Sequence, residues 1–289
     1  MFEGLSVAVV TPFRSGAVDE EAFRRLVSHL LGQGVDGLIA TGSTGEAATM
    51  TREERRTVVR AAVEEARGKA FVVAGTGTNN TAQSIELTRD AKEAGVDGIM
   101  VVTPYYNKPT PDGLVAHFRA ISESAGLPIV AYNVPGRTGY NMPPAVAARV
   151  AQVPNVVALK EASGSVDQSI DIMNLAPGLT LLSGDDSMTL ALQAVGGRGI
   201  VSVAGHLVAR EIRDMLTAAE GGNLEEARRL QRRIMPICRA MFLESNPGPV
   251  KYALSRVGRI ANELRLPLVP VGAETAAKVD RELKDLGLI

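Results

Sequence analysis

The chain has 289 residues, and its 31 Lys and Arg side chains nearly balance its 32 Asp and Glu side chains. This balanced and dispersed charge argues against a basic surface for nucleic acid or anionic lipid. Cys238 is the only cysteine, which excludes an internal disulfide and a thiolate metal cage, and with no basic leader and no apolar run of roughly 18 residues we expect a cytoplasmic protein.

Short runs rich in β-branched residues alternate along the chain with amphipathic helical stretches. Eight of these runs are interpreted as strands: residues 6–12, 36–42, 70–77, 97–104, 128–135, 155–163, 180–186 and 199–205. The runs are apolar on both faces, which is typical of parallel strands covered by helices. Eight successive units are the number that closes a (β/α)8 barrel, and an open doubly wound sheet is the alternative.

Capping signals mark the starts of helices between the strands. Thr51 with Glu54, and Ser165 with Gln168, fit the capping box. Glycines stand where these helices are expected to end.

The region after the eighth strand contains more helix than one barrel unit needs. We therefore predict a (β/α)8 barrel over residues 1–222 and a C-terminal helical extension over residues 223–289. The stretch R-L-P-L-V-P, residues 265–270, is expected to interrupt the helices of the extension.

Active sites of such barrels lie at the C-terminal ends of the strands. In this sequence those ends carry hydroxyls, phenols, small residues and one lysine, whereas the strand starts are apolar. The stretches are T-P-F, G-S-T-G-E, G-T-G-T-N-N, T-P-Y-Y-N, Y-N-V-P-G-R-T-G, K-E-A-S-G, S-G-D-D and V-A-G-H. A site built from these side chains is expected at one rim of the barrel.

Lys160 ends the apolar run V-V-A-L-K. Strand alternation predicts that it shares a face with Val156, Ala158 and Ala162, and that Val157 takes the opposite face. A strand-end lysine can snorkel to solvent or pair with a carboxylate, but the small alanines leave room for a ligand. Burial would lower its pKa from about 10.4 toward roughly 7 to 8 and yield a neutral nucleophile for Schiff-base formation with a carbonyl.

Other residues at the predicted rim could bind a 2-keto acid. Ser43 and Thr44 offer hydroxyls and backbone N–H groups to a carboxylate, although G-S-T-G is also an ordinary turn composition. Tyr132 is a candidate proton shuttle, although a buried tyrosine is commonly a core residue. Arg137 could hold a second carboxylate or lie solvated in its loop. Their arrival together at one rim favours a site.

Six motifs together resemble the dihydrodipicolinate synthase family, within the N-acetylneuraminate lyase superfamily, over essentially the whole chain. They are G-S-T-G-E-A-A-T, T-P-Y-Y-N-K-P, Y-N-V-P-G-R-T-G, A-L-K-E-A-S-G, L-L-S-G-D-D and N-P-G-P-V-K. The resemblance implies a (β/α)8 barrel with a C-terminal helical domain, a homotetramer built as a dimer of dimers, and no cofactor or metal. It also implies a Schiff-base condensation of pyruvate with L-aspartate 4-semialdehyde, the committed step of lysine and diaminopimelate synthesis.

The resemblance assigns roles to individual residues. It implies that Lys160 forms the imine with pyruvate, that Ser43 and Thr44 hold the pyruvate carboxylate, and that Arg137 binds the semialdehyde carboxylate. The imine loses a proton to become an enamine, the enamine attacks the aldehyde, and the substrate amine then closes the ring and expels the lysine. The other implied site residues are the proton-relay members Tyr132, Thr44 and Tyr106, with Tyr106 reaching in from a neighbouring subunit, and the backbone contacts Gly184 and Val201. Ser43 stands where many members have threonine and keeps the hydroxyl.

The resemblance also implies an allosteric site for lysine. Its positions in this chain are Ala48, Arg52, Arg55, Asn79, Gln83 and Tyr105. Arg52 and Arg55 stand where lysine-sensitive relatives carry histidine or acid, and Gln83 stands where they carry glutamate. A cationic ligand would meet added positive charge and lose a counter-ion, so we expect weak inhibition by lysine or none.

Competing functions require different residues. N-acetylneuraminate lyase and 2-keto-3-deoxy sugar-acid aldolases share the lysine, the G-x-T-G turn and the tyrosine, and Arg137 in R-T-G favours the synthase over them. A phosphate-handling barrel would bind phosphate after strands seven and eight, where Asp185 and Asp186 repel it. This aspartate pair suits turn and capping roles better than Mg²⁺, and the three histidines lack ligand spacing. A metabolite-binding barrel without catalysis is distinguished by adding pyruvate and borohydride.

Overall fold

A computed structural model describes residues 1–289, the whole chain, as a closed barrel of eight parallel strands. Around the barrel the strands follow the order β1-β10-β9-β8-β7-β6-β5-β4. They are β1 (Gly4–Ala8), β4 (Gly37–Ala40), β5 (Phe71–Gly75), β6 (Gly98–Val102), β7 (Ile129–Asn133), β8 (Val156–Glu161), β9 (Thr180–Ser183) and β10 (Gly199–Ser202). Each overlaps one of the eight predicted runs, so the (β/α)8 barrel is confirmed and the open sheet is excluded.

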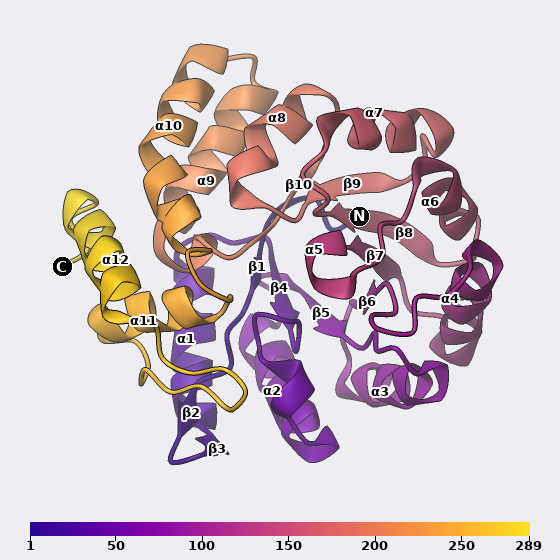
Figure 1. Cartoon of the computed structure of the whole chain (residues 1–289), viewed down its shortest axis with the longest axis horizontal. Helices are drawn as coiled ribbons and strands as arrows, with labels where there is room; N and C mark the ends of the chain where they lie inside the picture. The colour runs from indigo at the N-terminus through magenta and orange to yellow at the C-terminus, as the bar shows by residue number, and fades with distance from the viewer.

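Helices form a ring around the strands (Figure 1). They are α1 (Glu20–Gly32), α2 (Arg52–Ala66), α3 (Thr81–Ala94), α4 (Pro111–Ala125), α5 (Pro135–Thr138), α6 (Pro144–Ala151), α7 (Val166–Leu175), α8 (Thr189–Ala194) and α9 (Gly205–Glu220), with the 3₁₀ turns η1 (Ala47–Thr49) and η2 (Asp186–Met188). A small antiparallel hairpin of β2 (Phe13–Arg14) and β3 (Ala17–Val18) follows β1 and was not predicted. None of the helices has both the length and the hydropathy that crossing a bilayer requires.

The two predicted capping boxes turn out differently. At the start of α2, the Thr51 hydroxyl accepts from the Glu54 N–H and the Glu54 carboxylate accepts from the Thr51 N–H, so this box is confirmed. At the start of α7, Ser165 accepts from the Gln168 N–H, but the Gln168 side chain donates to Asn141 Oδ1. The prediction of the second capping box is therefore wrong in one of its two hydrogen bonds, because the Gln168 side chain bonds to Asn141 and not to the N–H group of Ser165.

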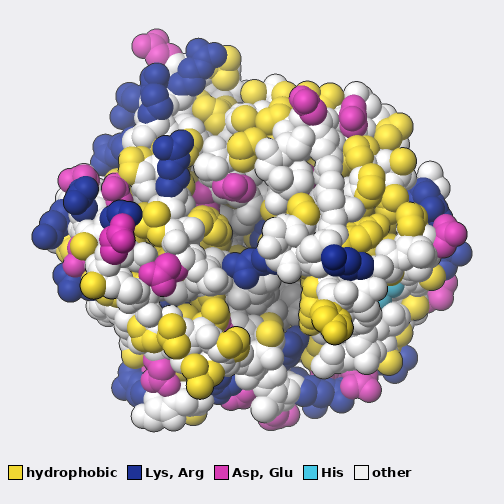
Figure 2. All heavy atoms as spheres, in the orientation of Figure 1, with side chains coloured by type: hydrophobic (Ala, Val, Ile, Leu, Met, Phe, Trp, Pro, Cys, Tyr) yellow, Lys and Arg dark blue, Asp and Glu magenta, His cyan; other side chains and the backbone are white.

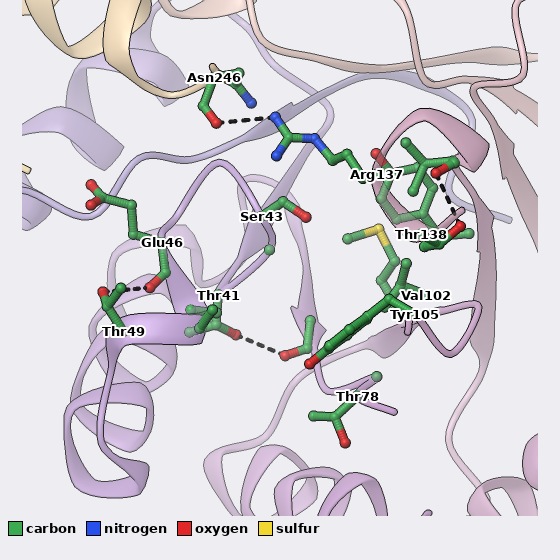
Figure 3. A pocket seen from close by; sticks show the side chains of 18 of the residues that line it. Thr41, Ser43, Glu46, Thr49, Thr78, Val102, Tyr105, Arg137, Thr138 and Asn246 are labelled. Carbon is green, nitrogen blue, oxygen red and sulfur yellow. Dashed lines mark hydrogen bonds between the residues drawn. The ribbon is translucent and has the colours of Figure 1, made fainter. Parts of the chain in front are cut away.

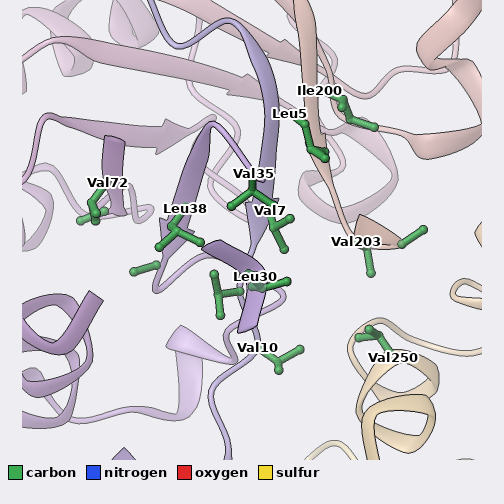
Figure 4. Packing of buried hydrophobic residues seen from close by; sticks show 14 of the residues in the cluster. Leu5, Val7, Val10, Leu30, Val35, Leu38, Val72, Ile200, Val203 and Val250 are labelled. Carbon is green, nitrogen blue, oxygen red and sulfur yellow. The ribbon is translucent and has the colours of Figure 1, made fainter. Parts of the chain in front are cut away.

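Two apolar clusters explain why the strands are apolar on both faces. The larger cluster, of 59 buried residues, fills the layer between the barrel and its helices, where Leu38, Val72 and Ile200 pack (Figure 4). The smaller cluster, of 11 buried residues, fills the inside of the barrel and includes Ile39 and Val73. A polar side chain that points inward therefore enters a space with little water.

Strand β8 departs from strict alternation at its start. Its pairing with β7 shifts register near the first residues of both strands. Val156 packs in the outer cluster, whereas Val157 packs against the inner cluster that contains Ala158. The prediction that Val156 shares a face with Lys160 is therefore wrong, because the irregularity moves the first residues of the strand by one position.

The C-terminal extension lies beside the barrel (Figure 1). It consists of α10 (Leu224–Ala240), which packs on α9, and of α11 (Gly248–Arg256) and α12 (Ala273–Asp285), which pack on each other. The predicted interruption at residues 265–270 lies between α11 and α12, where no helix is present. The predicted boundary after residue 222 falls in the turn between α9 and α10, and the division into two domains stays a prediction.

A buried ion pair joins the extension to the rim of the barrel. Lys251 Nζ in α11 pairs with Glu46 of the G-S-T-G-E loop, and neither side chain is exposed to solvent. The same Nζ lies 4.2 Å from the centroid of the Phe13 ring, and the Arg265 N–H donates to the second Glu46 oxygen at 3.0 Å. Removing one partner of a buried pair costs about 3 to 5 kcal/mol. The extension therefore holds the G-S-T-G-E loop in place.

Candidate active site

Lys160 lies near the end of β8 and points into the barrel. Its side chain is 5% exposed, and its Nζ lies 4.2 Å from the centroid of the Tyr132 ring. Lys160 pairs in register with Tyr132 on β7 and with Leu182 on β9, so neighbouring strands fix its place. No carboxylate forms an ion pair with the amine, and the snorkelling and ion-paired alternatives are both excluded.

The surroundings of Lys160 favour a neutral amine. Burial, and next the positive charge of Arg137, lower the pKa of Lys160 to about 7, while the negative charge of Asp186 opposes this. The direction agrees with the expectation from the sequence. Near neutral pH a substantial fraction of the amines is then unprotonated and nucleophilic.

Gly184, which follows β9, leaves the space that the lysine needs. A Cβ atom at this position would lie 2.8 Å from the Ala162 Cβ and 3.1 Å from the Lys160 Cε. Gly184 therefore lines the chamber around Lys160, and its backbone contact with a ligand stays a prediction. Val201 does not line it but packs in the inner apolar cluster, and Val203 lines the chamber instead. Val201 points into the packed interior because it stands below the carboxyl end of its strand.

Two cavities meet at this rim. The chamber around Lys160 has a volume of about 190 Å³, and a wider cavity of about 360 Å³ lies beside it. Ser43, Tyr132, Arg137 and Asn246 line both cavities. Figure 2 shows a hollow near the middle of this face with basic side chains at its edge, and Figure 3 shows the wider cavity from close by.

The G-S-T-G-E loop presents polar groups that have no partner in the chain. The backbone N–H groups of Ser43 and Thr44 donate to no acceptor within the chain. Thr44 is buried and its hydroxyl oxygen accepts from Asn246 Nδ2 at 2.9 Å, while Ser43 is exposed and lines both cavities. Such free donors around a cavity form a site for an anion.

Tyr132 carries its phenol into the same space. Burial raises the pKa of Tyr132 to about 12, so the phenol stays protonated at neutral pH and can donate. No hydrogen bond joins the Tyr132 and Thr44 hydroxyls in this chain, and the Thr44 oxygen accepts from Asn246 Nδ2. The relay through Thr44 stays a prediction.

Arg137 projects from the short helix α5 toward the cavities (Figure 3). Its Nη2 donates to the backbone oxygen of Asn246 at 3.0 Å, which is the only hydrogen bond of the guanidinium within the chain, and the guanidinium has no carboxylate partner. The remaining N–H groups of its fork are available to a ligand.

Tyr106 does not reach either cavity of its own chain. It is 89% exposed in the loop after β6 and has a positive φ of 69°. Its neighbour Tyr105 lines the wider cavity instead.

The predicted allosteric residues separate into two groups. Ala48, Arg55 and Tyr105 line the wider cavity, whereas Arg52, Asn79 and Gln83 do not. Arg52 donates to both Asp90 oxygens at 2.5 and 2.8 Å, so its charge is compensated on the outside of α2 and the expectation that it repels a ligand is wrong.

Arg55 behaves differently from Arg52. It donates to the Ala47 oxygen and has no carboxylate partner, and burial lowers its pKa. Among the predicted allosteric residues, Arg55 alone therefore brings an uncompensated positive charge to the wider cavity.

The sequence did not single out Asn246 of this rim, whereas it did draw attention to Asp186. Asn246 contacts both Thr44 and Arg137 although it lies in the C-terminal extension, 202 and 109 residues away along the chain. Asp186 accepts from Ser202 and from the Val203 and Ala204 N–H groups.

Asp185 accepts from the Ser187 N–H, so both aspartates of S-G-D-D fill the turn and capping roles that we expected. The motif N-P-G-P-V-K pointed to the neighbourhood of Asn246 but assigned it no role.

The whole chain matches known proteins. The model of the Dihydrodipicolinate synthetase family matches residues 1–286. The 4-hydroxy-tetrahydrodipicolinate synthases of Maridesulfovibrio salexigens and Trichlorobacter lovleyi are 47% and 46% identical to it over 290 residues, which cover 100% of this chain and 99% and 100% of theirs. The crystal structure of dihydrodipicolinate synthase from Thermotoga maritima is 42% identical, covers 100% of both chains and gives a TM-score of 0.97.

Proposed function

This chain belongs to the dihydrodipicolinate synthetase family, and on that premise we propose that it condenses pyruvate with L-aspartate 4-semialdehyde to 4-hydroxy-tetrahydrodipicolinate. The reaction is the committed step of lysine and diaminopimelate synthesis. One observation carries the proposal: a buried amine of depressed pKa, Lys160, shares a small chamber with free donors for a carboxylate. Assays with pyruvate and a panel of aldehydes, the semialdehyde against sugar aldehydes, test the second substrate.

Lys160 is the proposed nucleophile. Its neutral amine attacks the keto carbon of pyruvate, the keto oxygen leaves as water, and a protonated imine forms. Loss of a proton from the pyruvate methyl group gives an enamine, whose carbon attacks the aldehyde carbon of the semialdehyde while the aldehyde oxygen becomes a hydroxyl. The substrate amine then adds to the imine carbon, closes the ring and expels Lys160.

Two anion sites orient the substrates. Ser43 and Thr44 line the chamber of Lys160, and their N–H groups and the Thr44 hydroxyl donate to no acceptor within the chain, which supports their assignment to the pyruvate carboxylate. Arg137 lies where the two cavities meet, and its free N–H groups suit a carboxylate that reaches the chamber from outside. We assign Arg137 to the semialdehyde carboxylate.

Tyr132 is the proposed proton shuttle, because its phenol stays protonated and lies against Lys160. Thr44 lines the chamber alone and is engaged by Asn246, whereas Ser43 lines both cavities. We therefore propose that the Ser43 hydroxyl continues the relay that begins at Tyr132. Thr44 remains a ligand of the pyruvate carboxylate.

Tyr106 requires a second subunit if it is to take part. An aromatic side chain that is 89% exposed and turned away from its own cavities is suited to contact another copy of the chain. We propose a homotetramer, a dimer of dimers, in which Tyr106 completes the relay of a neighbour. Light scattering measures the assembly, and Tyr106→Phe tests whether its hydroxyl carries protons.

The pH profile is expected to report the state of Lys160. We expect kcat/KM for pyruvate to rise up to a pH of about 7 and to level off above it, because attack requires the neutral amine. Arg137 lowers this pKa and Asp186 raises it. The pH range over which the rate rises therefore depends on both neighbouring charges. Initial rates between about pH 5.5 and 9.5 measure it. A limb that still rises above pH 9 would mean that the amine keeps an ordinary pKa.

Lysine is expected to inhibit the enzyme weakly or not at all. Arg55 brings an unpaired positive charge to the wider cavity, and no carboxylate stands there to receive an ammonium group except Glu46, which Lys251 already holds. The like charge and the missing counter-ion weaken binding by about 2 to 5 kcal/mol, which is 30-fold to several-thousand-fold. Steady-state rates at saturating pyruvate with lysine up to millimolar levels measure the effect.

Two variants test the cause of weak lysine binding. Arg55→Gln removes the uncompensated charge and should tighten the binding of lysine. Arg52→Gln is the matched control, because Asp90 already compensates that arginine and its removal should leave lysine binding unchanged. Half-inhibition of the wild type at sub-millimolar lysine would show that Arg55 does not exclude the ligand.

A further inference from the structure

Asn246 brings the C-terminal extension into the active site. It lies between α10 and α11, is 5% exposed, and lines both cavities. Figure 3 shows it at the wider cavity. Its side-chain Nδ2 donates to Thr44 Oγ1 at 2.9 Å, and its backbone oxygen accepts from Arg137 Nη2 at 3.0 Å. One residue thus contacts the proposed ligands of both substrate carboxylates.

The bond from Asn246 determines where the Thr44 proton can go. A hydroxyl has one proton to donate, and an amide N–H group has no lone pair to accept it. The Thr44 oxygen is occupied as an acceptor by Asn246, and its proton finds no acceptor within the chain. The proton is therefore available to an acceptor in the chamber of Lys160, which Thr44 lines.

Other buried threonines of the rim behave differently. Thr11 donates to the Gly45 oxygen, Thr41 to the Gly75 oxygen, and Thr138 to backbone oxygens of its own turn. The hydroxyl protons of these three threonines are thus used in hydrogen bonds within the fold. Of these four threonines, Thr44 is the one whose hydroxyl accepts from a side-chain amide and donates to no acceptor within the chain.

The rest of the Asn246 side chain is not arranged for stability. Its Oδ1 is buried and has no hydrogen-bond partner. An orphaned buried acceptor is unfavourable, and such a group in a folded protein calls for a functional explanation. The bond to Thr44 is the only hydrogen bond that the Asn246 side chain makes within the chain.

We propose that Asn246 is a positioning residue that directs the Thr44 hydroxyl proton toward the carboxylate of bound pyruvate. The inference rests on the proposed function, because it names the group that Thr44 donates to. Asn246 touches no reacting atom in this role and acts through Thr44. Its backbone oxygen independently holds Arg137, so a change of side chain should affect pyruvate and spare the semialdehyde.

Two substitutions at this position test the proposal. Asn246→Asp replaces the donor with an acceptor of the same shape, so the Thr44 proton turns to the new carboxylate, and the KM for pyruvate should rise about 30-fold or more. Asn246→Ser removes the amide without adding charge and should raise it about 5- to 10-fold. The KM for the semialdehyde should change less than about twofold in both, because the carbonyl that holds Arg137 remains. Equal changes for both substrates, or an unchanged pyruvate KM, would overturn the proposal.

The controls separate positioning from a general loss of structure. Asn262→Asp is the matched charge control, because Asn262 also has a buried Oδ1 without a partner and lines neither cavity. In a Thr44→Val background, Asn246→Ser should have no further effect on pyruvate, since the two residues act as a unit. Additive effects would overturn the link through Thr44. Thermal unfolding identifies variants that do not fold. If Asn246→Asp does not fold, the pyruvate KM of Asn246→Ser is compared with that of the wild type.

Borohydride trapping of pyruvate on the wild type separates this inference from the proposed function. If the wild type is labelled and the Asn246 variants keep its pyruvate KM, the positioning role alone is wrong. If the wild type is not labelled, the proposed function fails and the role of Asn246 fails with it.

Discussion

Replacing Lys160 with alanine is expected to abolish both the reaction and the labelling of the protein by pyruvate and borohydride. Reduction traps an imine as a stable secondary amine, so the wild type should gain one pyruvate-derived adduct per chain. Lys160 is the one amine of depressed pKa in the chamber. Without it the covalent route is closed, and kcat should fall by about 10³-fold or more. Mass spectrometry of the intact protein and of its peptides measures the adduct and its position.

Two controls separate the loss of the nucleophile from the loss of a charge or of the fold. Lys160→Arg keeps a cation of similar length but cannot form the imine, so it should be as inactive as the alanine variant. Lys278→Ala changes an exposed lysine of α12 and should be labelled like the wild type. An adduct that persists in Lys160→Ala would place the Schiff base on another residue.

The barrel could be predicted because its strands are covered on both sides. Runs such as residues 36–42 and 97–104 have an apolar centre, and that centre lies between an inner and an outer cluster of buried residues. The predicted limits were less accurate than the number of strands. Val9 and Val10, for example, continue the first apolar run beyond β1, because the chain stays buried after its ladder of hydrogen bonds ends.

The small hairpin of β2 and β3, by contrast, could not be predicted from the sequence. Its strands have two residues each, which is too short for an alternating pattern to appear in the sequence. The irregular start of β8 has a similar cause. A register shift depends on the pairing with β7, and no residue type in V-V-A-L-K marks it.

The site was predictable where it depends on strand ends. Lys160 and Tyr132 end neighbouring strands, so the closing of a parallel barrel places them side by side. Arg52 could not be judged in this way, because its partner Asp90 comes from the next helix, 38 residues later. The role of Asn246 was still harder to predict, since its contact with Thr44 spans 202 residues and depends on how the extension packs.

Replacing Arg137 with alanine is expected to raise the KM for the semialdehyde far more than the KM for pyruvate. A bidentate bond between a guanidinium and a carboxylate is strong, so kcat/KM for the semialdehyde should fall by a factor that corresponds to about 2 to 4 kcal/mol. The single hydrogen bond of Arg137 to Asn246 leaves the fork free for this role. Arg137→Lys keeps the charge but not the fork and should recover only part of the loss.

Arg137→Ala also changes the pKa of Lys160, and this effect must be separated from the effect on binding of the semialdehyde. The positive charge of Arg137 lowers the pKa of Lys160, so its removal raises that pKa and leaves less neutral amine at pH 7. Pyruvate kinetics should therefore worsen at pH 7 and recover at about pH 9, where the amine is mostly neutral in either protein. The loss for the semialdehyde should persist at pH 9, because a missing carboxylate ligand does not depend on that proton. Equal losses for both substrates at pH 9 would mean that Arg137 shapes the whole site and does not bind the semialdehyde carboxylate.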